Sequence, residues 1–426
     1  MLRPRSSRPG THCSVLCAGG WTSCICRMAA KAGIYSRRTR MSADRRGRPR
    51  ICIVVAAPMT LKAFMLGHMQ ALARIAEVTV VADFAPEDGT FPWPVAIIRV
   101  AIPIARPIAP VADLRALRAL FRLFRRERYD LVHSITPKAG LLSMLAGALA
   151  GVPLRLHSFT GQVWVTRTGL MRTLLKSADR LIARLATHVL ADSRSQREFL
   201  IAQGIVAASK SAVLAHGSIC GVDTARFKPD TAARERIRSS HGIPSGAVVF
   251  LYLGRINRDK GLLDLAHAFA GAGQPNAHLL LVGPDEGNLS AALSSAAGGC
   301  AARLHSAGLT DRPQEYFAAA DVFCLPSYRE GFGATIIEAA AAGVPSIGSR
   351  IYGITDAIVE GETGLLFEAG SVQQLEQSMR TLAGDAGLRA RMGVQARERA
   401  TRDFSSAGVT AALLEYYEKL LALRAA

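Results

Sequence analysis

Two glutamates flank a segment that begins with small residues and continues into an apolar run, Glu330-Gly-Phe-Gly-Ala-Thr-Ile-Ile-Glu338. If a helix begins near Gly333, its first N–H groups have no partner within the helix, and with the helix dipole they attract a diphosphate. A carboxylate such as Glu338 can accept hydrogen bonds from both hydroxyls of a ribose. The pattern favours a sugar-nucleotide site. The alternative is a solvated acidic helix start, where Glu is common.

A second cluster, Tyr252-Leu-Gly-Arg-Ile-Asn-Arg-Asp-Lys-Gly261, directly follows a predicted strand. Gly254 permits close approach of the backbone, and Arg255 and Lys260 place two cations at the end of the strand. Positive charge there would neutralise a pyrophosphate. Taken alone, the cluster is also compatible with an ordinary strand-to-helix turn with solvated basic residues. Its combination with the glutamate segment favours the phosphate site.

Short β-branched runs alternate with amphipathic helical stretches from residue 51 onward, which is typical of a parallel sheet covered by helices. The turn-rich passage 221–229 separates two such series. We therefore predict an α/β fold of two Rossmann-like domains whose parallel sheets face a central cleft, where ligands bind beyond the C-terminal strand ends. The predicted strands are 51–56, 78–81, 95–100, 131–133, 154–156 and 188–190, then 248–253, 278–282, 322–325 and 344–347.

The chain has 426 residues, more than one hydrophobic core usually covers, so two domains are expected. No run of about eighteen residues is free of charge or Pro, so no membrane-spanning helix is predicted. The predicted parts are a basic leader at 1–49, an N-terminal Rossmann-like domain at 50–228, a C-terminal Rossmann-like domain at 229–404, and a C-terminal helix at 405–426 that crosses back to the first domain.

The formal net charge of +19 is concentrated near the start of the chain. Residues 1–50 contain twelve Lys and Arg against the single acid Asp44, which leaves only +8 for the rest. The leader is predicted to be disordered, or not part of the translated protein, with Met41 a plausible true start. Its four cysteines match no common zinc spacing, and no continuous apolar run suggests a secretory signal. The other four cysteines are widely scattered, which suits a reducing cytoplasm.

Other function classes fit the sequence less well. A nucleic-acid-binding protein would spread basic and aromatic residues over its folded domains, but only 6% of residues are aromatic and the charge excess lies in the leader. A nicotinamide dehydrogenase needs Gly-x-Gly-x-x-Gly after the first strand, where this chain has Ala56-Ala-Pro-Met59. No lysine context for a phosphorylase cofactor is found.

The chain resembles the retaining family 4 glycosyltransferases of the GT-B fold over about residues 51–424. The motifs that carry the resemblance are Gly254-Arg255 with Lys260, Leu281-Val-Gly-Pro284, Glu330-Gly-Phe-Gly to Glu338, Gly343-Val-Pro345 and Gly364-Leu-Leu-Phe367. The resemblance implies that Arg255 and Lys260 hold the donor diphosphate, Glu338 the ribose, and Glu330 the donor sugar and its developing charge. Backbone amides of Gly331, Phe332 and Gly333 would lie near the phosphate and sugar.

In the first half, His157-Ser-Phe-Thr-Gly-Gln-Val-Trp164 follows a strand, and His157 is matched to the active-site histidine of that family. The alternative is a histidine with satisfied hydrogen bonds in the core. Together with residues 132–140, this segment resembles the subgroup that transfers sugars to undecaprenyl-diphosphate-linked acceptors. Thr160, Gly161 and Lys138 are therefore predicted on the acceptor side. Residues 57–66 lack the glycine pair of many relatives, a departure that affects how the acceptor and diphosphate fit against this loop. Cys220 stands where relatives often have Asn. Neither departure touches the predicted donor residues.

The resemblance implies transfer of a sugar, with retention, from a nucleotide-diphosphate donor such as a UDP-sugar to a lipid-linked saccharide in bacterial surface glycan synthesis. Asp-x-Asp is absent, so no essential metal and no cofactor are expected. The alternatives are a soluble acceptor, or a sugar-nucleotide epimerase of the same fold.

A lipid-linked acceptor requires contact with a membrane, predicted here as the cytoplasmic face of the bacterial plasma membrane. Residues 113–128 place apolar side chains at helical spacing with arginines largely elsewhere, as a helix on anionic lipid would. Residues 64–66 would add apolar contact, and residues 171–185 show a similar pattern. The alternative is a pair of ordinary amphipathic helices that cover a sheet.

Overall fold

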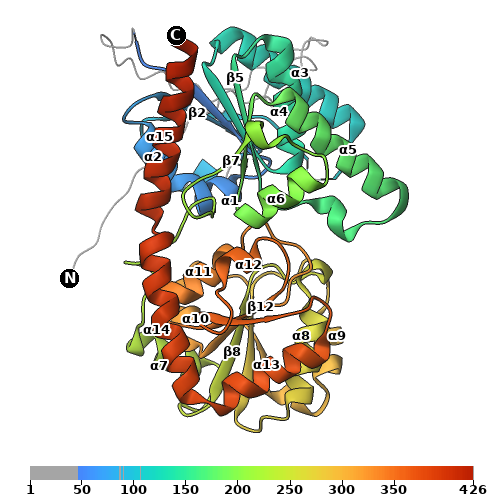
Figure 1. Cartoon of the computed structure of the whole chain (residues 1–426), viewed down its shortest axis with the longest axis vertical. Helices are drawn as coiled ribbons and strands as arrows, with labels where there is room; N and C mark the ends of the chain where they lie inside the picture. The colour runs from blue at the N-terminus through green and yellow to red at the C-terminus, as the bar shows by residue number, and fades with distance from the viewer. Residues whose placement is uncertain (1–46, 86–87, 90, 106, 426) are drawn as a thin grey trace, which may run out of the picture. The chain divides into compact units, whose positions relative to one another are not determined.

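The computed structural model describes residues 47–425 apart from 86, 87, 90 and 106, so almost all of the predicted leader lies outside the described residues. The described chain forms two parallel β-sheets, one of seven strands and one of six. Helices cover both sheets (Figure 1). This arrangement confirms the predicted α/β fold with two Rossmann-like domains, called here the first and second lobes.

The first sheet has the strand order β3-β2-β1-β4-β5-β6-β7, and every neighbouring pair is parallel. Six of its strands correspond to predicted runs. The seventh, β7, has only three residues, too few for a periodic signal in the sequence. The strands are β1 Arg50–Val54, β2 Glu77–Ala82, β3 Ile97–Ala101, β4 Leu131–Ile135, β5 Leu154–Phe159, β6 His188–Ala191 and β7 Ser211–Val213.

Alternate residues of β1 face two different cores because side chains of a strand point to opposite faces. Cys52 and Val54 pack with residues of α3, α4 and α5, whereas Ile51 and Ile53 pack with residues of α2 and of the C-terminal helix α15, Ser406–Ala425. Helices therefore cover both faces of the first sheet. Their bounds are α1 Pro58–Thr60, a π-helical turn Leu61–Met65, α2 Leu66–Leu72, α3 Pro110–Glu127, α4 Pro137–Ala150, α5 Gly169–Leu185 and α6 Arg194–Ala202.

The second sheet has the order β10-β9-β8-β11-β12-β13, again with parallel neighbours. The sequence predicted four of its strands and missed the edge strands β10 and β13. The strands are β8 Val248–Leu253, β9 Ala277–Val282, β10 Leu304–Ser306, β11 Val322–Leu325, β12 Ser346–Ser349 and β13 Gly364–Phe367. The helices are α7 Thr231–Ser240, α8 Leu262–Ala272, α9 Ser290–Ala297, α10 Pro313–Ala319, α11 Ala334–Ala341, α12 Ile354–Ala357, α13 Val372–Gly384 and α14 Ala386–Asp403.

The last helix, α15 (Ser406–Ala425), follows α14 of the second lobe but packs against α2 of the first lobe. Its Tyr417 is fully buried, and the Tyr417 hydroxyl lies 2.6 Å from Nδ1 of His133 on β4. The segment predicted for residues 405–426 is thus a helix that contacts the first lobe. None of the described helices is both long enough and apolar enough to span a membrane.

Candidate active site

The loop after β8 brings the basic cluster close to β9 and β11. Gly254 and Gly261 both have positive φ, of +155° and +66°. A Cβ on Gly261 would lie 2.1 Å from the carbonyl oxygen of Pro326, so only glycine fits beside the end of β11. This close approach sets the short helical turn Arg258–Lys260 beside the loop that holds Glu330.

Lys260 and Glu330 form an ion pair although they are 70 residues apart in the chain. Lys260 Nζ lies 2.5 Å from Glu330 Oε1, and the Ser327 hydroxyl donates to the same oxygen at 2.8 Å. Both charged side chains are largely buried, 17% and 15% exposed. The structure therefore brings the basic cluster 252–261 into contact with the glutamate segment 330–338, a contact that the sequence alone does not show.

Arg255 is the more exposed of the two predicted phosphate ligands. Its Nη1 lies 3.0 Å from Oε2 of Glu286, in the loop after β9, and both side chains are accessible to solvent. The Arg255 carbonyl accepts a hydrogen bond from the buried Tyr252 hydroxyl at 2.8 Å, which fixes the backbone of the turn. Arg255 can exchange Glu286 for another anion at little cost, since exposed ion pairs are weak.

Helix α11 begins directly after the glycine loop, as the sequence predicted. Gly333 precedes it in the left-handed conformation, with no side chain that caps the helix. In the described part of the chain, no acceptor is found for the N–H groups of Gly333, Ala334 and Thr335. Phe332 is buried against the Phe404 ring, with centroids 5.1 Å apart, which holds the loop in place. Amides that have no acceptor at the start of a helix are suited to a phosphate.

Glu338 lies inside α11, and burial raises its pKa to about 7, against the opposing effect of Arg226. No hydrogen-bond donor to its carboxylate is found among the described residues. A carboxylate in this state can accept hydrogen bonds from a ligand hydroxyl. Its role in ribose binding stays a prediction.

The acceptor-side loop of the first lobe touches the glycine loop of the second. A Cβ on Gly161 would lie 3.2 Å from the carbonyl carbon of Glu330, and one on Gly331 would lie 2.7 Å from that of Thr160. Gly331 is further enclosed by Oδ2 of Asp192, 2.7 Å from the same Cβ position. Thr160 and Gly161 are thus brought to the predicted donor residues.

His157 has its contacts within the first lobe. It is 1% exposed, its Nδ1 lies 2.8 Å from the Ser134 hydroxyl, and its ring packs under the first turn of α4. A Cβ on Gly140 of that turn would lie 2.4 Å from the ring, and burial lowers the pKa of His157 to about 3. This placement matches the alternative of a core histidine. The catalytic role of His157 stays a prediction.

Lys138 also has its contacts within the first lobe. Its ammonium group lies 2.6 Å from Oδ1 of Asp113 on α3 and donates to the carbonyl oxygen of Pro107. The pairing neutralises its charge within the first lobe, so its acceptor-side role likewise stays a prediction.

A set of hydrogen bonds between the lobes has no signal in the sequence. The carboxylate of Asp356, on α12, accepts from the backbone N–H groups of Arg194 and Ser195 at the start of α6 and from the Ser195 hydroxyl. The Ser193 hydroxyl donates to the carbonyl oxygen of Gly331 at 3.0 Å, and the N–H of Gly353 donates to the Ser195 hydroxyl at 2.8 Å. A carboxylate of one lobe thus caps a helix of the other.

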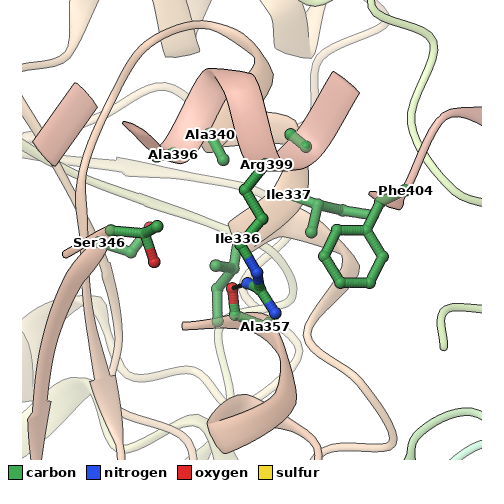
Figure 2. A pocket seen from close by; sticks show the side chains of 10 residues that line it. Ile336, Ile337, Ala340, Ser346, Ala357, Ala396, Arg399 and Phe404 are labelled. Atoms are coloured by element: carbon green, nitrogen blue, oxygen red, sulfur yellow. Dashed lines mark hydrogen bonds between the residues drawn. The ribbon is translucent and has the colours of Figure 1, made fainter. Parts of the chain in front are cut away.

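Arg399 on α14 supports this contact from within the second lobe. Its guanidinium donates to the carbonyl oxygens of Asp356 and Ala357, both at 2.6 Å, and lies 4.9 Å from the centre of the Phe404 ring. Figure 2 shows Arg399 reaching from its helix toward Ala357 across a small, mostly apolar pocket. The pocket has a volume of about 10 Å³, room for about one water, so it is no substrate site.

Asp192 is a second residue that sequence reasoning missed. It is 8% exposed at the end of β6, and burial raises its pKa to about 8. No donor to its carboxylate is found in the described residues. It lies against Gly331 and lines a small cavity with His133, Ser158 and Ser218. Nothing in the local sequence distinguishes it from a solvated aspartate.

Known proteins are similar to this chain in sequence and in architecture. Residues 62–217 match the family described as "Glycosyl transferase 4-like domain", and residues 233–399 match "Glycosyl transferases group 1". The chain is 30% identical over 338 residues to a capsular polysaccharide biosynthesis glycosyltransferase, CapM, of Staphylococcus aureus, covering 76% of this chain and 86% of that one. It is 29% identical over 287 residues to a D-inositol 3-phosphate glycosyltransferase of Arthrobacter, covering 62% and 65%.

Solved structures show the same fold at low identity. A sucrose-phosphate synthase of Thermosynechococcus elongatus superposes with a TM-score of 0.75 at 21% identity, covering 88% of this chain and all of that one. Anabaena HepE, in complex with UDP and glucose, superposes with a TM-score of 0.75 at 19% identity, covering 87% and 100%. With two parallel-sheet lobes joined at their loops and these family matches, the chain belongs to the family 4 glycosyltransferases of the GT-B fold.

Proposed function

We propose that this glycosyltransferase moves a sugar, with retention of anomeric configuration, from a UDP-sugar to an undecaprenyl-diphosphate-linked saccharide. The proposed donor site rests on one observation: Lys260 contacts Glu330 close to the start of α11, where N–H groups have no acceptor among the described residues. The name of the CapM relative, a capsular polysaccharide enzyme, supports a cell-envelope product. The UDP complexes of HepE support a uridine nucleotide.

The chemistry follows from two opposite charges that develop as the donor bond breaks. Negative charge grows on the leaving diphosphate, and positive charge grows on the sugar ring. Lys260, Arg255 and the amides of α11 would stabilise the first charge. Glu330, freed from Lys260 when the ammonium turns to phosphate, would stabilise the second.

We propose that these cations replace a metal ion at the diphosphate. Arg255 supplies a planar guanidinium that suits phosphate oxygens, and Lys260 supplies a compact charge. Dialysis against a chelator should leave the transfer rate unchanged. A loss of activity that Mg²⁺ or Mn²⁺ restores would show that the cations are insufficient.

A direct assay tests donor and acceptor together. Purified protein is offered a panel of UDP- and GDP-sugars with a bacterial membrane extract, and sugar in the lipid fraction is followed by mass spectrometry. We expect transfer from one UDP-sugar into that fraction, and an unchanged anomeric configuration in the NMR spectrum of the product. Transfer only from GDP-sugars would refute the donor assignment.

A water-soluble acceptor is the second candidate, because one relative is named for D-inositol 3-phosphate. Transfer found only in the aqueous phase of the same assay would establish it. The donor assignment would stand in that case.

A further inference from the structure

Exposed large apolar side chains are concentrated on the first lobe. Among the described residues, fifteen such side chains are exposed, and twelve of them lie between Met59 and Leu181. Four belong to α5, where Leu170, Met171, Leu174 and Leu181 are 85%, 46%, 53% and 42% exposed. Scattered exposed apolar residues need no explanation, but several on one helix indicate a surface that meets an apolar partner.

The apolar residues of α5 form a stripe that points away from the core. Leu170, Leu174 and Leu181 follow one another at spacings of four and seven residues, so they lie on one face of the helix. The opposite face is buried through Ile182 and Asp179. The packing of α5 on its own lobe is therefore complete without the stripe.

The charge around the stripe has a single sign. Every exposed charged side chain on α3 and α5 is an arginine, and the three acids of these helices are partnered: Asp113 with Lys138, Glu127 with Arg50, and buried Asp179 with Trp164. In Figure 1, α3, α4 and α5 lie beside one another over the first sheet. The arginines are Arg115, Arg118, Arg122, Arg125, Arg126, Arg172, Arg180 and Arg184.

We propose that the outer face of α5, with the arginines of α3 on the far side of α4, docks on an anionic lipid bilayer. Leucines enter the acyl boundary while arginines contact phosphate headgroups. A second copy of the chain would set arginines against arginines. The basic segment 1–46 would do the same, so an anionic surface is the better complement. The biological role of this docking rests on the proposed lipid-linked acceptor. The docking itself is inferred from the exposed leucines and arginines alone.

The docking helix is joined firmly to the acceptor-side loop. Trp164 follows Gln162 by two residues, is buried, and donates from Nε1 to Oδ2 of Asp179 on α5 at 2.8 Å. Lys176 Nζ lies 5.1 Å from the centre of the Trp164 ring. A bilayer that binds α5 would therefore hold the loop of Thr160 and Gly161 at a fixed distance from its surface.

Sedimentation with vesicles tests the docking face. The full chain is mixed with vesicles of phosphatidylglycerol and phosphatidylcholine, or of phosphatidylcholine alone, over a range of salt. We expect binding to the anionic vesicles, weakened by salt, and at least about tenfold weaker binding for both Leu170→Ser/Leu174→Ser and Arg180→Gln/Arg184→Gln. Val394→Ser, which removes a 60% exposed apolar side chain from α14, is the matched control and should bind like the parent chain.

Three results would overturn the proposal: no binding by the parent chain, binding of the double variants as strong as that of the parent chain, or a concentration-dependent dimer that Leu170→Ser/Leu174→Ser abolishes. Equal thermal unfolding of all variants checks that they fold. Transfer to a detergent-solubilised lipid acceptor separates the two proposals. Vesicle binding without such transfer would support the docking surface on α5 and contradict the lipid-linked acceptor. Transfer without vesicle binding would support the lipid-linked acceptor and contradict the docking surface.

Discussion

The ammonium group of Lys260 lies 2.5 Å from the carboxylate of Glu330, so the two residues assigned to diphosphate and sugar are paired with each other. The pair keeps two largely buried charges compensated. Donor binding would exchange it for two new contacts, phosphate with Lys260 and sugar with Glu330. The pair thus places both groups within reach of one donor molecule.

Lys260→Ala should lower kcat/KM for the donor about 10²- to 10³-fold, because it removes a cation from the leaving group. Arg258→Ala is the matched control, since it removes the same charge from an exposed residue of the same short turn. Steady-state kinetics with a UDP-sugar measure both. If the two variants behave alike, Lys260 has no specific role.

Glu286→Gln should lower the donor KM by up to about fivefold, because Arg255 no longer has to leave an ion pair of about 0 to 1 kcal/mol. Arg255→Ala should raise the donor KM well beyond that range. Both effects are read from donor titrations at constant acceptor. A raised KM in Glu286→Gln would contradict the view that Glu286 competes with the donor phosphate.

His157→Ala should act on stability more than on chemistry. It removes a fully buried ring and leaves the Ser134 hydroxyl without its partner, so the free energy of unfolding should fall by about 2 to 4 kcal/mol. Thr160→Ala, at the lobe junction, should reduce kcat with little change in Tm. A hundredfold loss of kcat in His157→Ala with an unchanged Tm would instead support the catalytic role predicted from the sequence.

Donor affinity should improve as pH rises from 6 to 8 if Glu338 binds the ribose as proposed, since burial raises the pKa of Glu338 to about 7 and its ionised carboxylate would accept from ribose hydroxyls. The donor KM should fall severalfold over this interval, and Glu338→Gln should give a flat profile. The contribution of Glu338 to the free energy of unfolding changes in the opposite direction and falls as the pH rises. Because burial raises this pKa in the folded state, its stabilising contribution is complete below about pH 4.5 and is lost as the pH rises through 7.

Gly331→Ala should abolish transfer while leaving each lobe folded. The added Cβ would lie 2.7 Å from both Asp192 Oδ2 and the carbonyl carbon of Thr160, so the lobes would be forced apart. Gly299→Ala is the control, because no atom lies within 4 Å of its added Cβ. Activity assays with circular dichroism measure the effect. Activity near that of the control would show that this contact of the lobes is dispensable.

Local patterns determined most of the fold. Runs of β-branched residues, helical spacing and turn residues act over a few positions, so the two series of strands and the start of α11 were predictable. The edge strand β10 and the short β7 were missed because three residues give too little periodicity. The glutamate segment and the turn from Arg255 to Lys260 could also be predicted from the sequence, because each motif lies within ten consecutive residues.

Only the tertiary structure decided how these parts meet. The sequence shows that His157 follows a strand, but only the structure shows that its ring packs in the core against Gly140. Thr160, three residues later, contacts Gly331 of the second lobe. Asp192 became a buried carboxyl, and Asp356 capped a helix 161 residues away. Burial and long-range contacts arise from the surfaces that fold against a residue. Those surfaces come from distant parts of the chain, so no local pattern contains them.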